Sequence, residues 1–312
     1  MRVLWDLENR MDISVIICTW NNSGRLAMTL GAVSGCIVPP GVKWQVVLVN
    51  NSCTDDTDQV AQRFAGKLPL VYVKEPQQGL SRARNAGLKA ASGELILFTD
   101  DDVRPFREWI ETYWSAYQER PAGYYFGGPI QIEYETLKPD EELLRFAPPS
   151  VRGLYYGPTD RILMKREGFI SANWACPAEV IRNVGFFDIQ KGLNAASKKI
   201  RTGEERDLMD RLNNCGWKGL YLRRAELVHF VPEAKCTLRH IGDRAEGFAA
   251  FVASNRNNTS RSKMICGIPR WMIKQLIMLW IKWTWLRVKG ETAYGEYIEF
   301  RKMKGTIEGH RG

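Results

Sequence analysis

The chain has 312 residues, of which 45% are hydrophobic and 25% are charged, and its formal net charge is +9. This length allows one large domain or two ordinary ones, and the composition excludes a disordered or fibrous chain. The charge is uneven, because residues 251–312 hold 12 Lys/Arg against 4 Asp/Glu, whereas residues 1–250 hold 32 against 31. The basic character therefore belongs to the C-terminal part of the chain.

Cysteine spacing and hydropathy exclude several further classes of protein. The seven cysteines include no C-x-x-C pair and are odd in number, which argues against a zinc ribbon and a disulfide framework. The opening residues MRVLWDLENR lack the apolar run of a signal peptide, and no run of about 18 apolar residues follows. We therefore expect reduced thiols in a cytoplasmic protein, either in solution or peripheral on the cytoplasmic face of the membrane.

The first hundred residues show a repeated β/α pattern. Between Ile13 and Thr99, short apolar runs alternate with helical segments, which is typical of helices flanking a mostly parallel sheet. Ser23 precedes an apolar-periodic segment and predicts the cap of the first helix. The predicted strands are 13–18, 44–50, 68–73 and 94–99, and the predicted helices are 23–35, 53–66 and 79–93.

The pattern becomes less regular after Arg104. A helix is predicted around Trp109 and Trp114, and the polar, glycine-bearing segment 190–203 predicts a mobile loop. The remaining predictions are a strand-like segment at 124–134, a strand, turn and helix over 168–188, a helix at 204–217, and closing strands at 219–223 and 226–231.

Three consecutive aspartates follow the strand predicted for residues 94–99. Ligand sites in open α/β sheets collect beyond the carboxyl ends of the strands, and the other strand ends carry the polar segments 19–21 and 50–52. Asp100 and Asp102 form a D-x-D pair that can bind Mn²⁺ or Mg²⁺ through oxygen. Plain hydration of an acidic surface turn would also explain three adjacent carboxylates. The position of the pair nevertheless favours a metal site.

Five segments in this order resemble the family 2 inverting glycosyltransferases. They are VIICTWNNSGRL, VVLVNNSCTDDT, GLSRARNAGLKAASGELILFTDDDV, SANWACPAEVIRNVGFFD and GEERDLMDRLNNCGW, and they cover about residues 13–230. The resemblance implies an α/β fold of the GT-A (Rossmann-like) type. Its domains would be an N-terminal extension (1–11), a GT-A domain (12–235) with a nucleotide-binding half (12–103) and an acceptor half (104–235), and a helical, basic region (236–312).

The resemblance also assigns contacts with the donor nucleotide. The family usually has an aspartate that accepts the uracil N3–H where this chain has Asn50, whose amide oxygen accepts less strongly than a carboxylate. A UDP-sugar is therefore favoured, and GDP- and dTDP-sugars stay open. Trp20 suits the base, with core packing as the alternative, and the basic residues suit a phosphate or a solvated helix face. The assigned residues are Thr19, Trp20, Asn21, Asn50, Arg82, Arg84, Asp100 and Asp101.

The metal ligands that the resemblance implies are Asp102 and Asp100, with His229 as a third ligand. A buried structural histidine is the alternative for His229. Either Mn²⁺ or Mg²⁺ would serve as the cofactor.

The catalytic base comes from the family's E-D pair. In GEERDL, Glu205 stands at the position of the family's aspartate, and Glu204 precedes it. Both glutamates would also oppose the dipole of the helix that they begin. The resemblance places Asn173 and Trp174 in the acceptor and sugar pocket.

These assignments predict an inverting transferase that moves a sugar from a nucleotide-sugar to a hydroxyl of a glycan or lipid-linked acceptor, in cell-surface polysaccharide or glycoconjugate synthesis. A sugar nucleotidyltransferase is the alternative enzyme, but the chain lacks its glycine-rich, lysine-bearing loop after the first strand. A non-catalytic protein that binds nucleic acid or membrane would leave the D-x-D pair unexplained, so no nucleic-acid partner is expected. The sequence leaves the oligomeric state open.

The segment 268–289 combines four tryptophans with Leu, Ile and Met. If it is helical, Arg270, Lys274, Lys282 and Lys289 gather in about a third of the circumference. Interfacial tryptophans and flanking cations suit a helix that lies on a membrane surface. Packing against the protein or against a second subunit is the alternative.

Overall fold

The computed structural model describes residues 10–120, 122–136, 138–165, 167–193, 200, 202–255 and 264–311. The described residues form two compact units. The first lies within Met1–Glu133, Gly153–Lys191 and Glu204–Phe230, and the second within Tyr134–Arg152, Gly192–Gly203 and Val231–Gly312. Most of the predicted N-terminal extension and much of the predicted loop at 190–203 lie outside the described residues.

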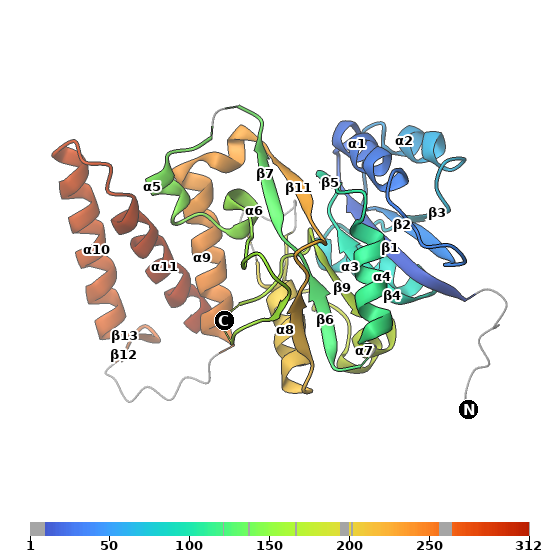
Figure 1. Cartoon of the computed structure of the whole chain (residues 1–312). Helices are drawn as coiled ribbons and strands as arrows, with labels where there is room; N and C mark the ends of the chain where they lie inside the picture. Colours follow the sequence, from blue (N-terminus) through green and yellow to red (C-terminus); the bar gives the residue numbers. More distant parts are fainter. Residues whose placement is uncertain are drawn as a thin grey trace. The chain divides into compact units, whose positions relative to one another are not determined.

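The central sheet of the first unit is mixed. Within the described residues, eight strands lie in the order β3-β2-β1-β4-β9-β6-β10-β8. Figure 1 labels β1 to β4, β6 and β9 of this sheet. The first four pair in parallel, β9 is antiparallel to both of its neighbours, and β10 is parallel to β6. The strands are β1 (Met11–Thr19), β2 (Trp44–Asn50), β3 (Leu70–Lys74), β4 (Gly93–Thr99), β6 (Tyr124–Gly127), β8 (Arg161–Ile162), β9 (Trp174–Pro177) and β10 (Lys218–Tyr221).

Helices follow the parallel strands in turn. Asn22, not Ser23, is the N-cap residue of α1, so the predicted Ser23 cap is wrong; instead the Ser23 N–H donates to the Asp55 carboxylate (2.8 Å). The helix α3 lies close to the sheet, because a Cβ on Gly87 would come within 2.7 Å of the Ile16 side chain. The helices are α1 (Ser23–Ser34), α2 (Thr57–Phe64), α3 (Leu80–Ala90), α4 (Trp109–Glu119), α7 (Ala178–Val184) and α8 (Glu204–Asn214).

The core of the first unit is built on the central sheet. The strands β1, β2 and β4 are buried over most of their length, as expected for parallel strands with both faces covered. Aromatic side chains continue this core toward β9, where Trp174 stacks on Phe98 with ring centroids 4.7 Å apart. Burial of this apolar surface is the main favourable contribution to folding.

A small second sheet of the order β5-β11-β7 fixes the region after the three aspartates. In its antiparallel pairing, Val103 of β5 lies opposite His229 of β11. The Phe230 N–H also donates to the Asp102 carbonyl (2.8 Å). Residues far apart in the sequence are thereby brought together beside the end of β4. The strands are β5 (Val103–Pro105), β7 (Ile130–Tyr134) and β11 (Leu227–Val231).

The second unit is mainly helical (Figure 1). Gly305 and Gly309 of α11 let it approach the backbone of α9 closely, since a Cβ on either glycine would overlap that helix. The helix α10 packs on α11 through Trp283, which stacks on Phe300. No helix of the described residues is both long and apolar enough to cross a bilayer. The elements are α5 (Glu141–Leu144), α6 (Pro149–Arg152), η2 (Glu233–Cys236), α9 (Leu238–Ser254), β12 (Met264–Ile265), β13 (Ile268–Pro269), α10 (Arg270–Val288) and α11 (Tyr294–Arg311).

Candidate active site

Three polar strand ends meet at one edge of the central sheet. Thr19 pairs with Asn50 across β1 and β2, and Ile17 pairs with Thr99 across β1 and β4. Because these strands are parallel, the segments that follow them leave the sheet side by side. The Asn51 N–H donates to the Thr19 carbonyl (3.0 Å) and ties two of these segments together.

The aspartates after β4 and the histidine of β11 form a cluster of possible metal ligands. Within the described residues, ligand atoms of Asp100, Asp102 and His229 lie within 4.8 Å of one another. The His229 Nε2 is 3.2 Å from Asp102 Oδ1, and both side chains are buried. The buried Nδ1 of His229 has no hydrogen-bond partner among the described residues. The two carboxylates suit Mn²⁺ or Mg²⁺, and a neutral imidazole can serve as a further metal ligand.

The electrostatics of the three aspartates also favour a cation. Burial and the adjacent Asp102 carboxylate raise the pKa of Asp101 to about 7, although Asn22 donates a hydrogen bond to it (2.9 Å). Burial likewise raises the pKa of Asp100, and the guanidinium of Arg84 opposes this shift. Crowded carboxylates that resist ionisation gain most from a nearby positive charge. The site is therefore prepared for an ion or for a cationic group.

Arg84 lies at the centre of a second cluster, formed by α3, β4 and α8. Its side chain is 3% exposed and donates to Glu204 Oε1 (3.1 Å), which is equally buried. The same guanidinium lies 3.6 Å from Glu205 Oε1 and 3.9 Å from Asp100 Oδ1. Glu205 is more accessible, with 19% of its side chain exposed, and accepts the Ser171 N–H at 3.4 Å. The structure thus brings the two predicted glutamates next to the predicted metal ligands.

The remaining residues that were predicted to contact the donor lie at the end of β1, directly after it, or in α3. Thr19 is buried, whereas Trp20 is 46% exposed, and Asn21 has a positive φ of 49° and accepts the Thr54 N–H (2.7 Å). Arg82 is partly exposed and donates to the Gln77 side chain (2.6 Å).

Asn50 is already engaged within the protein. Its Nδ2 donates to Asp58 (2.9 Å) and to the Tyr72 hydroxyl (2.7 Å), and its Oδ1 accepts the Cys53 N–H (2.7 Å). Lys74 also pairs with Asp58 at 2.5 Å. Asp58, Tyr72 and Lys74 are not among the residues predicted from the sequence. The position of Asp58 in the helix after β2 was the available signal.

Asn173 and Trp174 lie in the core. Both are fully buried, and Asn173 Oδ1 accepts hydrogen bonds from Trp109 Nε1 (2.7 Å) and the Tyr113 hydroxyl (2.8 Å). Its Nδ2 donates to two backbone carbonyls, so every hydrogen-bonding group of this side chain is used inside the core. The predicted acceptor contact at these two residues does not agree with their position, because neither side chain has surface for a sugar to touch.

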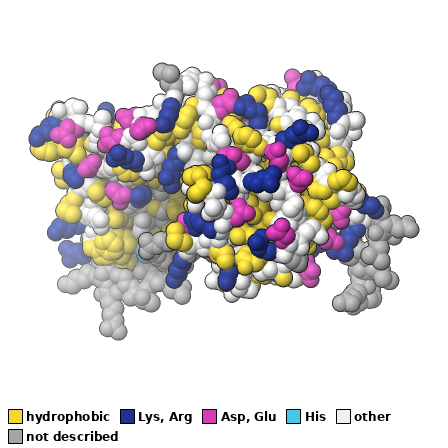
Figure 2. Space-filling model, in the orientation of Figure 1, with side chains coloured by type: hydrophobic (Ala, Val, Ile, Leu, Met, Phe, Trp, Pro, Cys, Tyr) yellow, Lys and Arg dark blue, Asp and Glu magenta, His cyan; other side chains and the backbone are white. Residues whose placement is uncertain are grey.

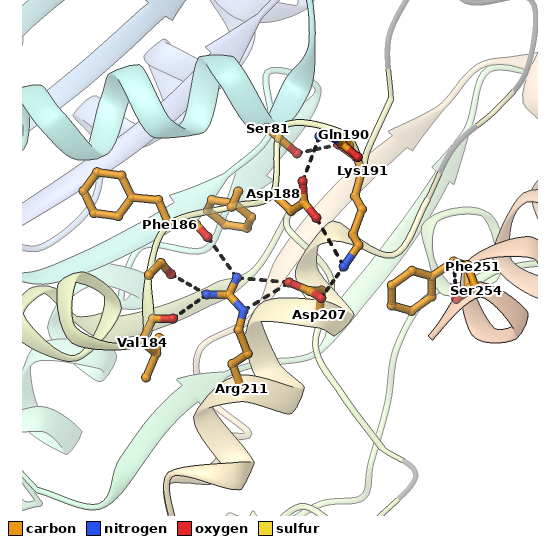
Figure 3. A network of polar contacts seen from close by, with 12 residues as sticks. Ser81, Val184, Phe186, Asp188, Gln190, Lys191, Asp207, Arg211, Phe251 and Ser254 are labelled. Atoms are coloured by element: carbon orange, nitrogen blue, oxygen red, sulfur yellow. Dashed lines mark hydrogen bonds and ion pairs between the residues drawn. The ribbon is translucent and has the colours of Figure 1, made fainter. Parts of the chain in front are cut away.

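A polar network that the sequence analysis missed holds α8 in place (Figure 3). Arg211 donates to the carbonyls of Val184 and Gly185 (both 2.6 Å) and of Phe186 (2.9 Å), which follow or end α7. Asp207 accepts from Arg211 (3.1 Å) and pairs with Lys191 (2.5 Å). The spacing of Asp207 and Arg211, four residues apart on one helix, was the signal for this pair. One helical turn separates Asp207 from Glu204, so the network fixes the helix end that carries both glutamates.

The model of glycosyl transferase family 2 matches residues 14–182 of the chain. This span runs from within β1 to within α7 and includes the three aspartates, and it ends before α8.

Two curated proteins of Haloferax volcanii are similar to parts of the chain. The glycosyltransferase AglE is 32% identical over 101 residues, which are 32% of this chain and 33% of AglE. The glucosyl-dolichyl phosphate glucuronosyltransferase is 22% identical over 227 residues, which are 72% of this chain and 70% of that enzyme. The chain thus spans a third of the length of the first relative.

The solved mannosyltransferase PcManGT from Pyrobaculum calidifontis, in complex with GDP-Man and Mn²⁺, is similar in structure. The TM-score is 0.54 at 20% sequence identity, and the match covers 80% of this chain and 66% of that chain. This likeness confirms the predicted α/β fold of the GT-A type. The predicted C-terminal helices are also present, as α9 to α11.

Proposed function

The chain belongs to glycosyltransferase family 2, and from this premise we propose that it is a metal-dependent, inverting transferase that moves a sugar from a nucleotide-sugar to an acceptor hydroxyl. The observation that carries this proposal is the proximity of two clusters, the metal-ligand group of Asp100, Asp102 and His229 and the glutamate pair of α8. Asp100 belongs to the first cluster and lies 3.9 Å from the guanidinium that binds the second.

Asp102, Asp100 and His229 would hold the Mn²⁺ or Mg²⁺ ion. The donor set fits a hard divalent cation, and the similar mannosyltransferase structure contains Mn²⁺. When bound, the ion would neutralise charge on the diphosphate leaving group. Trp20 and Arg82 would then lie on the side of the site that binds the nucleotide-sugar.

Glu205 is the proposed general base. Glu204 is buried, and its carboxylate accepts a hydrogen bond from Arg84. Glu205 lies near the same guanidinium, but its carboxylate is more accessible. Glu205 would remove the proton from the acceptor hydroxyl, and the alkoxide oxygen would attack the anomeric carbon from the face opposite the nucleotide. One displacement breaks the sugar–phosphate bond, releases the nucleoside diphosphate and inverts the anomeric configuration.

The donor and acceptor are proposed by class. Because Asn50 already binds within the protein, base recognition would depend on its neighbours as well, and a UDP-sugar remains favoured over a GDP- or dTDP-sugar. A glycan or a lipid-linked sugar would be the acceptor, in cell-surface polysaccharide or glycoconjugate synthesis. The similarity to a transferase named for a dolichyl phosphate substrate favours the lipid-linked class.

The helix α10 would place the enzyme on a membrane surface. Residues 247–290 contain eight Lys/Arg and no Asp/Glu. On the left of Figure 2, where Figure 1 labels α10, hydrophobic and basic side chains lie together with some acidic ones. Lipid-facing tryptophans and cations over anionic headgroups are the combination found in interfacial helices. The large exposed apolar side chains of this helix are Trp271, Ile277, Met278, Trp280, Ile281, Trp285 and Val288.

Replacing Glu205 by Gln tests the proposed base. The assay is Mn²⁺-dependent release of nucleoside diphosphate from UDP-glucose, UDP-N-acetylglucosamine and GDP-mannose. We expect Glu205→Gln to lower kcat by about 100- to 10,000-fold, the range for removal of a general base, while the Kd of the donor stays the same. Glu179→Gln is the matched control, because Glu179 also stands in the first turn of a helix, α7. Full turnover by Glu205→Gln would remove this residue from the role.

A further inference from the structure

Arg84 is as deeply buried as Glu204, and three carboxylates of the site lie close to its guanidinium. Three carboxylates surround its guanidinium: Glu204 at 3.1 Å, Glu205 at 3.6 Å and Asp100 at 3.9 Å. The ring of Phe187 lies 5.3 Å from its guanidinium carbon. Nearby carboxylates of this kind are the condition under which a buried arginine is stable.

The three carboxylates come from two separate parts of the fold. The proposed reaction requires these two parts to be held in a fixed position relative to each other. Asp100 follows β4 and belongs to the metal-ligand cluster, whereas Glu204 and Glu205 begin α8. Arg84 belongs to α3, which packs on β1 and β2. A single planar cation from a third, sheet-bound element therefore connects the metal side of the site with the base side.

The geometry of this contact is specific to arginine. Its Nη1 hydrogen-bonds to Glu204, while its buried Nη2 has no hydrogen-bond partner among the described residues, although it points between Glu205 and Asp100. A guanidinium can hold two carboxylates at fixed relative positions through separate nitrogens, and a lysine ammonium cannot reproduce this fork. The sequence suggested Arg84 as a donor contact, but its contacts in the structure are with the protein's own acids.

We propose that Arg84 is a positioning residue, which acts on the transfer through Glu204 and Glu205 and not by contact with the donor diphosphate. It fixes Glu204, holds Glu205 at the orientation needed to receive the acceptor proton, and keeps both glutamates beside the metal ligands. This inference rests on the proposed transferase function.

The test compares catalysis with binding in Arg84→Lys, which keeps the positive charge. Catalysis is measured as nucleoside diphosphate release from UDP-glucose, UDP-N-acetylglucosamine and GDP-mannose, and binding as the Kd of UDP and GDP with Mn²⁺. We expect kcat to fall at least about tenfold while the Kd values stay within about twofold of the wild type. Added guanidinium should restore part of the kcat of Arg84→Ala, which a purely structural role would not predict.

Arg161→Lys is the matched control, because Arg161 forms a bidentate pair with Glu167 in the same unit and lies on β8, an edge strand of the central sheet. It should leave both kcat and Kd unchanged. A rise of Kd with unchanged kcat in Arg84→Lys would show a donor contact and overturn the inference. An unchanged kcat with unchanged Kd would overturn it as well. If the wild type releases nucleoside diphosphate from none of the donors, the proposed function fails first, and this inference fails with it.

Discussion

Burial beside other carboxylates raises the pKa values of Asp100 and Asp101 at the site. Arg84 and Asn22 offset part of the repulsion among the three adjacent aspartates, and the proposed divalent cation would offset it further. His240, in the second unit, also has a shifted pKa. Burial, with Arg244 and Lys235 nearby, lowers the pKa of His240 to about 4.

The shifted pKa of His240 predicts acid sensitivity. An unfolded histidine binds a proton below about pH 6.5, whereas folded His240 stays neutral until about pH 4, so stability present above pH 6.5 is lost as the pH falls toward 4. We expect this group to lower the free energy of unfolding by about 1 kcal/mol between pH 7 and pH 5, which is about half of the full value of the shift because solvent screens a partly exposed imidazole. Urea titrations of wild type and His240→Gln at both pH values measure the difference. His310→Gln is the control, and an equal pH response of wild type and His240→Gln would contradict this prediction.

At the residue scale, the sequence predicted the positions of side chains that directly follow a strand. Asp100 and Asp102 follow β4 directly, so their place at the sheet edge could be predicted, and His229 lies beside them. Asn173 and Trp174 could not be placed in the same way. Their burial depends on partners contributed by distant elements, such as Trp109 of α4, which no local pattern reveals.

At the element scale, the parallel strands β1 to β4 were predictable because each combines a continuous apolar run with a following helix. The four predicted strands overlap the observed ones, and the largest shift of a strand's first or last residue is two residues. The insertion of antiparallel β9 between β4 and β6 was not predictable, since it depends on pairing between residues about 75 apart, such as Phe98 and Trp174. The cap of α1 failed for a related reason, because Asp55 from the loop before α2 takes that role.

The prediction at the scale of elements concerns membrane binding by α10. We expect the wild type to bind phosphatidylcholine vesicles only when they contain phosphatidylserine, since cations on the helix would meet anionic headgroups. Each reversed charge should weaken this attraction, so Lys274→Glu with Lys289→Glu should reduce binding at least about tenfold. Replacing Trp280 and Trp285 by Ser tests the apolar part of the contact. Vesicle co-sedimentation is the measurement.

The matched control for the vesicle experiment is Lys67→Glu with Lys89→Glu, which changes the net charge equally at exposed positions of the first unit. This variant should bind vesicles nearly as well as the wild type. Equal loss in both double variants would mean that net charge alone drives binding, and equal binding by all variants would remove α10 from this role.

At the scale of the whole molecule, charge and function are separated along the chain. Residues 1–250 are nearly neutral and contain every residue assigned to catalysis, whereas residues 247–290 hold eight Lys/Arg and no Asp/Glu. This division was visible in the sequence, because composition needs no knowledge of contacts. The split of the described residues into two units was not, since segments 134–152 and 192–203 join the C-terminal unit despite lying between segments of the first.

The central claim is that the carboxylates at the end of β4 bind a divalent ion together with a nucleotide-sugar. The most direct measurement is thermal unfolding with UDP-glucose, UDP-N-acetylglucosamine or GDP-mannose, with and without Mn²⁺, for wild type, Asp102→Asn and the surface control Asp210→Asn. We predict that at least one donor stabilises the wild type and the control only with Mn²⁺, by about 2.7 kcal/mol at 100 times its Kd, and does not stabilise Asp102→Asn. Stabilisation of Asp102→Asn equal to that of the wild type, or no response to any donor with Mn²⁺, would contradict the claim.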